Sequence, residues 1–68
     1  MTFNVYYKIE NNSLVHVGLT GAKDTKKISF DSYESCILFE DKLLRLMHNN
    51  TKVNNKMIKE LYKDIKGG

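Results

Sequence analysis

The chain has 68 residues, a net charge of +3, 41% hydrophobic and 28% charged residues, and a single cysteine. This length holds one small domain, and the composition excludes collagen-like, disordered and disulfide-linked classes. The N-terminus has no secretory leader pattern and the longest apolar run covers only residues 36–39, so we expect an intracellular protein without a membrane segment.

The first half of the chain predicts three strands. Residues 2–10 alternate between apolar and polar side chains, which is typical of a strand buried on one face. A turn at residues 11–13 leads to a second strand over 14–20, and a polar loop separates that from a short third strand over 26–30. Short connections between neighbouring strands predict a three-stranded antiparallel β-meander.

The register of the first two strands follows from keeping apolar residues on one face. A three-residue loop, or an equivalent bulge, pairs Glu10 with Leu14 and Tyr7 with Val17, whereas a two-residue loop inverts the second strand. The inward residues of the second strand are then Val15, Val17 and Leu19. The outer face of the sheet is expected to carry Asn4, Tyr6, Lys8, Leu14, His16, Lys27 and Ser29.

A core helix is predicted over residues 31–50. Asp31 is a good N-cap with Glu34 three residues later, as in a capping box, and Asn49-Asn50 ends the helix. At about 100° per residue its apolar side chains cover an arc of about 180°, with Glu40 in the middle. The members of this arc are Tyr33, Cys36, Ile37, Phe39, Leu43, Leu44, Leu46 and Met47.

Thr51 is expected to cap a second helix over residues 52–66, antiparallel to the first, with Gly67-Gly68 as its stop. We assign the side of the core helix with Phe39, Leu43 and Leu46 to the sheet and the side with Tyr33, Ile37 and Leu44 to the second helix, although the sequence also permits the reverse. The fold prediction is one α+β domain over residues 1–68: a β-meander followed by an antiparallel helical hairpin packed on one sheet face, β-β-β-α-α.

Three surfaces are candidates for partner binding. A lysine stripe about 80° wide runs along the second helix and could follow a phosphate backbone or an acidic protein; its members are Lys52, Lys56, Lys59, Lys63 and Lys66. The outer sheet face offers Tyr6, Lys8, His16 and Lys27. The exposed side of the core helix offers Leu38 beside the acidic Glu34 and Asp41.

Each surface also has a purely structural interpretation. The stripe has no arginine, and Glu60 could pair with Lys56 and Lys63, as on an ordinary solvated helix. The sheet face could be the wet side of an antiparallel sheet. A single exposed leucine needs no functional explanation.

Catalytic and metal sites are not predicted. Cys36 lies on the apolar arc and is expected in the core, and two histidines, His16 and His48, are too few for a metal site. No phosphate-binding glycine loop is present. We therefore expect no enzyme, no cofactor and no metal.

We expect a non-catalytic regulatory or inhibitory protein that binds a protein partner. Chains of this small size without predicted catalytic residues resemble, in type, the accessory proteins of phages and mobile elements. The alternative is a DNA- or RNA-binding module that uses the lysine stripe or the outer sheet face. Membrane association is not expected, and a homodimer is left open.

Overall fold

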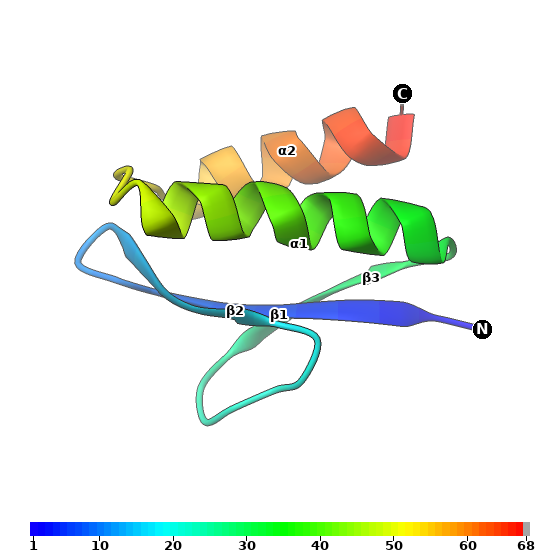
Figure 1. Cartoon of the computed structure of the whole chain (residues 1–68), viewed down its shortest axis with the longest axis horizontal. Helices are drawn as coiled ribbons and strands as arrows, with labels where there is room; N and C mark the ends of the chain where they lie inside the picture. The colour runs from blue at the N-terminus through cyan, green and yellow to red at the C-terminus, as the bar shows by residue number, and fades with distance from the viewer. Residues whose placement is uncertain (68) are drawn as a thin grey trace.

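A three-stranded antiparallel sheet carries two helices on one face in the computed structural model, which describes residues 1–67 (Figure 1). The elements are β1 (Phe3–Glu10), β2 (Ser13–Gly18), β3 (Lys26–Phe30), α1 (Tyr33–His48) and α2 (Asn55–Gly67). The predicted α+β class and the β-β-β-α-α order are confirmed. Gly67 ends α2, and Gly68 of the predicted helix stop lies outside the described residues.

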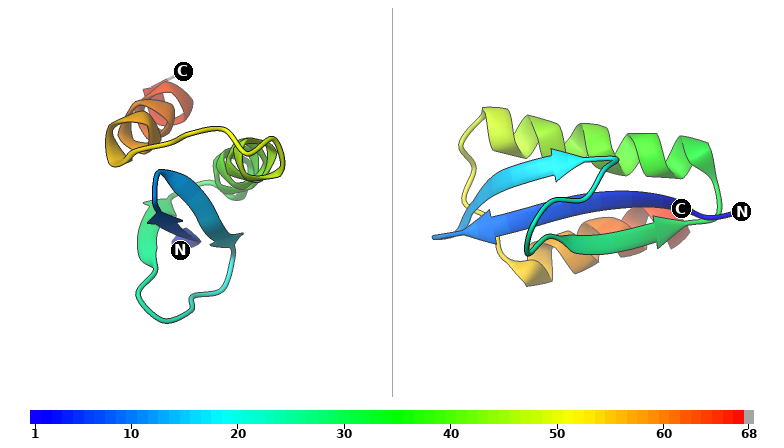
Figure 2. Two further views of the ribbon diagram at one scale, coloured as in Figure 1. Left: turned by 90° about the vertical axis from the view of Figure 1, so that its left-hand side faces the viewer. Right: turned by 90° about the horizontal axis from the view of Figure 1, so that it is seen from below.

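The strand order is β2-β1-β3, so the first strand is central. In the predicted meander the second strand would be central, and this detail is corrected. β1 is the longest strand, with inward-facing Val5 and Tyr7 buried, and it therefore gains most from a neighbour on each edge. The 19–25 connection then has to cross β1 to reach the far edge, on the face opposite the helices (Figure 2).

A bulge sets the register of β1 and β2. Asn11 and Asn12 form a two-residue turn with φ of 53° and 63°, so Glu10 pairs with Ser13 instead of Leu14. The register shifts after Ile9–Leu14, and the predicted Tyr7–Val17 pairing and equivalent bulge are confirmed.

This bulge changes which side chains of the second strand are buried. Leu14 is only 6% exposed, whereas Val15 is 50% and Leu19 42% exposed. The prediction that Val15 and Leu19 point inward and Leu14 outward is wrong, because the extra residue in β2 reverses the alternation. Leu14 and Val17 both face the core cluster as a result.

Both helices begin later than predicted. Ser32, not Asp31, is the N-cap of α1, and its hydroxyl accepts a hydrogen bond from the Ser35 amide at 3.3 Å. In α2 the Asn54 side chain accepts from the Met57 amide at 2.9 Å, which replaces the predicted cap at Thr51. The predicted end of α1 is confirmed, since Asn49 is its C-cap.

The segment between the helices, residues 51–54, explains the late start of α2. The Val53 amide donates to the Asn12 carbonyl at 2.8 Å, and the Val53 side chain is buried. A helix starting at residue 52 would turn Val53 away from the tip of the β1–β2 hairpin. Burial of this side chain and one backbone hydrogen bond therefore outweigh an extra helical turn.

The core lies between the sheet and the two helices, with α1 above β2 and α2 above β3 (Figure 2). The Phe30 ring of β3 lies 5.2 Å from both Phe39 of α1 and Tyr62 of α2. The Tyr33 ring contacts Phe3 of β1 at 5.5 Å. Tyr33 therefore faces the sheet, and its predicted assignment to the second helix is corrected.

Candidate binding surfaces

A shallow hollow on the exposed side of α1 brings together all three residues predicted there. Glu34, Leu38 and Asp41 line it together with Tyr33 and Ile37, and its volume is about 420 Å³. We call this surface the α1 hollow. Because residues three and four positions apart lie on one helix face, these five side chains share one side of α1.

The α1 hollow combines apolar contact area with negative charge. Tyr33 is 57% and Leu38 47% exposed, which is high for side chains of this size. Asp41 forms an exposed ion pair with Arg45 at 3.1 Å, while Glu34 in the first turn has no ion-pair partner within residues 1–67. The hollow thus offers a partner an apolar floor and a carboxylate at its margin.

Tyr33 and Ile37 were not predicted as site residues. Their place on the wide apolar arc suggested burial against the second helix, but the Tyr33 ring contacts Phe3 of the sheet and both side chains line the α1 hollow. The apolar arc is wider than one contact surface requires. This width was the only feature of the sequence that indicated an uncovered part of the arc.

The lysine stripe is shorter than predicted. α2 holds Lys56, Lys59, Lys63 and Lys66, whereas Lys52 lies in the extended segment before the helix. Within the described part of the chain the only ion pairs join Lys8 to Glu10 and Arg45 to Asp41. The predicted pairs of Glu60 with Lys56 and Lys63 are therefore not formed.

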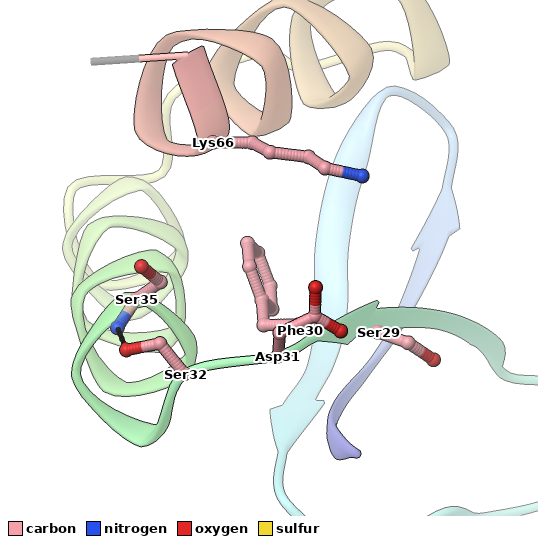
Figure 3. Close-up of a pocket in the computed structure, with 6 residues that line it drawn as sticks. All are labelled: Ser29, Phe30, Asp31, Ser32, Ser35 and Lys66. Atoms are coloured by element: carbon pink, nitrogen blue, oxygen red, sulfur yellow. Dashed lines mark hydrogen bonds between the residues drawn. The ribbon is translucent and has the colours of Figure 1, made fainter. Parts of the chain in front are cut away.

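Lys66 is the best positioned member of the stripe. Its ammonium donates to the Tyr62 hydroxyl at 3.2 Å and lies 5.4 Å from the centre of that ring. The Tyr62 hydroxyl, and to a smaller extent Asp31, raise the pKa of this lysine. Lys66 and Asp31 line opposite sides of a hollow of about 280 Å³ with Phe30 at its floor (Figure 3).

The outer sheet face is partly covered. Tyr6 pairs with Lys27 and Lys8 with His16 across the strands, as predicted from their common face. However, the 19–25 connection crosses this face: a Cβ on Gly21 would lie 3.1 Å from the Tyr6 ring, and His16 Nε2 donates to the Thr20 carbonyl at 3.1 Å.

Interactions between neighbouring side chains further reduce the number of polar groups on this face that are free to bind a ligand. The Lys8 ammonium lies 2.9 Å from the Glu10 carboxylate, whose hydrogen bond and charge raise the lysine pKa. Ser29 donates to the Asn4 side chain at 2.6 Å. Among the four residues predicted as a binding site on this face, only Lys27 is exposed; the other three, Tyr6, Lys8 and His16, are half-buried.

Glu40 is half-buried and belongs to the side of α1 that faces β1 and β2. Tyr33, two turns earlier on the same side, contacts Phe3 and shares a hollow with Leu19. The sequence pattern predicts that Glu40 emerges in the groove between the sheet and the second helix, and its place on the Tyr33 side of α1 does not fit that prediction. Its charge helps to raise the pKa of the neighbouring Cys36 thiol, after burial as the main cause.

The described residues, 1–67, contain no group of three His, Cys, Asp or Glu side chains that could hold a metal ion. None of the helices in that range is long and apolar enough to cross a membrane. Comparisons with protein-family models, curated proteins and solved structures give no match to this chain.

Proposed function

We propose that this protein is a non-catalytic regulator or inhibitor that binds a protein partner through the α1 hollow. The observation that carries the proposal is the exposure of Tyr33 and Leu38 around one hollow with two carboxylates at its margin. Aromatic and aliphatic anchors in a pocket with a polar rim are the usual centre of a protein interface. A role of this type fits the small accessory proteins of phages and mobile elements.

The chemistry of the hollow indicates what the partner presents. An apolar side chain would fill the space between Tyr33, Ile37 and Leu38, and a lysine or arginine beside it would meet Glu34 or Asp41. A second copy of this chain fits less well. A two-fold contact centred on the hollow would bring Glu34 of one copy near Asp41 of the other.

A variant-controlled capture experiment tests the proposal. The tagged protein, a Leu38→Asp variant and a Met57→Asp variant are each incubated with lysate of cells that carry the gene, with and without nuclease treatment. Met57 is a matched control because it is also a partly exposed helical side chain, at 37%, but on α2. Circular dichroism verifies that all three proteins are folded.

We expect one protein to be retained by the unchanged chain and by Met57→Asp, and to fall by about tenfold with Leu38→Asp. Retention that disappears on nuclease treatment, or that is equal for both variants, would contradict the proposal.

The second candidate function is nucleic-acid binding through α2. It is favoured by four lysines along one helix that form no ion pair with a side-chain carboxylate within residues 1–67, in a chain of net charge +3. If all four contact phosphates, a mobility-shift assay should show affinity falling about 100-fold between 50 and 200 mM salt. Absence of a shift at the lower salt would exclude this function. The single arginine is already paired with Asp41.

A further inference from the structure

β3 is an edge strand with one unpaired side. It pairs with β1 on one side only, and no strand among residues 1–67 pairs with its other side. An edge strand presents backbone N–H and C=O groups that an extended chain can bind. The sheet has two free edges, one on β3 and one on β2. The β3 edge lies beneath α2, whereas the β2 edge lies beneath α1 (Figure 2).

Three hollows follow one another along β3, and the central one lies between β3 and α2. The central one, about 330 Å³, is lined by Tyr7, Lys27, Ile28, Ser29, Lys59 and Tyr62. It shares Ser29 with the hollow beside Lys66 and shares Tyr7 with a third, beside Lys26 and Asn55. We call this continuous surface the edge groove.

The charge of the edge groove is positive in its middle and mixed at its ends. Lys27 and Lys59 line the central hollow, and Lys66 and Lys26 line the flanking ones. Asp31 lies at one end and Asp24 at the other. An acidic ligand would therefore be attracted most strongly to the middle of β3, whereas Asp31 and Asp24 weaken the attraction of the lysines at the two ends.

The same charges argue against a second copy of the chain as the ligand. Two β3 strands paired about a two-fold axis would place Lys26 of one copy opposite Phe30 of the other, and Lys27 opposite Ser29. The two copies would then add four lysines to one seam, and neither strand carries a carboxylate to offset their repulsion. An acidic strand converts this repulsion into attraction at the same positions. The edge groove thus discriminates by charge as well as by backbone hydrogen bonding.

We propose that β3 accepts an extended acidic segment of a protein partner as a fourth strand, held on the α2 side by Lys59 and Lys66. Side chains alternate along β3, with Lys26, Ile28 and Phe30 on the helix side, opposite the inward residues of β1. Lys27 and Ser29 point to the other face. Acidic side chains on the helix side of the bound segment meet Lys59 and Lys66, and the alternate residues of the segment lie on the other face.

The proposal concerns a surface separate from the α1 hollow, and its test uses defined peptides. The probe is acetyl-Gly-Glu-Val-Glu-Val-Glu-Gly-amide, titrated into the ¹⁵N-labelled protein and followed by amide chemical shifts. One control peptide replaces glutamate by lysine. A second carries N-methyl groups at alternate residues, on the edge that would pair with β3, which removes strand hydrogen bonds while leaving the charges in place.

Two double variants separate a local site from diffuse attraction. The first, Lys59→Glu with Lys66→Glu, reverses the charge of the two α2 lysines that line the edge groove. The second, Lys56→Glu with Lys63→Glu, makes the same charge change on α2 at positions that do not line the groove. We expect the first pair to weaken peptide binding by about tenfold or more and the second by less than about threefold.

Further expected results are perturbation and slowed hydrogen exchange of amides within residues 26–30, and loss of binding with the N-methylated peptide. Equal loss in both double variants, binding unaffected by N-methylation, or tighter binding of a DNA duplex through the same residues would overturn the proposal. Leu38→Asp should leave peptide binding unchanged. Failure here is therefore distinguishable from failure of the α1 hollow.

Discussion

At the scale of the residue, Cys36 shows how burial controls chemistry in this protein. Its side chain is almost fully buried in the core, and burial, with a smaller contribution from the Glu40 charge, raises the pKa of its thiol. Burial also raises the pKa of Tyr7. Both groups are neutral in the folded protein at neutral pH, which fits a structural role.

These shifts predict a loss of stability at alkaline pH. Below pH 9.0, the unperturbed thiol value, both folded and unfolded chains keep the proton and stability is complete. As the pH rises above 9.0 the unfolded thiol ionises first, and above 10.0 the unfolded Tyr7 follows. Because the folded state then binds more protons than the unfolded one, unfolding becomes easier.

The measurement is the urea midpoint as a function of pH from 7.5 to 10.5. We expect the midpoint to fall above pH 9. In a Cys36→Ala variant, the fall from the variant's own midpoint at pH 7.5 should be smaller than the corresponding fall in the unchanged protein. A midpoint that is constant or rises over this range would contradict the inferred pKa directions.

At the scale of the element, the bulge in β2 determines which residues build the core. Leu14 is buried and Val15 is exposed because the two strands shift register between them. Leu14→Ala should therefore cost about 2–5 kcal/mol of unfolding free energy. Val15→Ala should cost less than about 1 kcal/mol. Chemical denaturation of the two variants provides the comparison, and similar losses, or a larger loss for Val15, would exclude this register.

Helix and strand patterns in the sequence predicted most of this architecture. Alternation over β1, the apolar arc of α1 and the Asn49-Asn50 stop all correspond to observed elements. The surface formed by Glu34, Leu38 and Asp41 was also predictable, since helical spacing alone brings these residues together. Local periodicity is sufficient for features of this kind.

Features that depend on tertiary contacts were not predictable from local pattern. Asp31 and Ser32 are both good N-caps, and only the path of the chain out of β3 selects Ser32. Asn54 caps α2 because Val53 docks on the hairpin tip. The edge groove arises from β3 crossing to the far side of β1, which no sequence period encodes.

At the scale of the whole molecule, surfaces of opposite charge lie on opposite flanks. The α1 hollow, with its carboxylates, is on the α1 side, and the edge groove, with its lysines, is between β3 and α2 on the other side (Figure 2). If both proposals hold, one copy of the chain would bind two protein segments through different surfaces.

The small size of the domain determines which variants can test this arrangement. Domains of this length have a total stability of about 3–10 kcal/mol. Truncation of a fully buried side chain such as Phe39 costs about 3–5 kcal/mol and would unfold much of the protein. Exposed positions such as Leu38 and Met57 are therefore the informative ones.

Partner binding through the α1 hollow is tested most directly by an amide chemical-shift map of the ¹⁵N-labelled protein with the partner captured from lysate. We expect the largest perturbations to centre on residues 33–41 of α1, and we expect Leu38→Asp, but not Met57→Asp, to abolish them. Perturbations confined to the lysines of α2, or a map unchanged by Leu38→Asp, would contradict binding through this hollow.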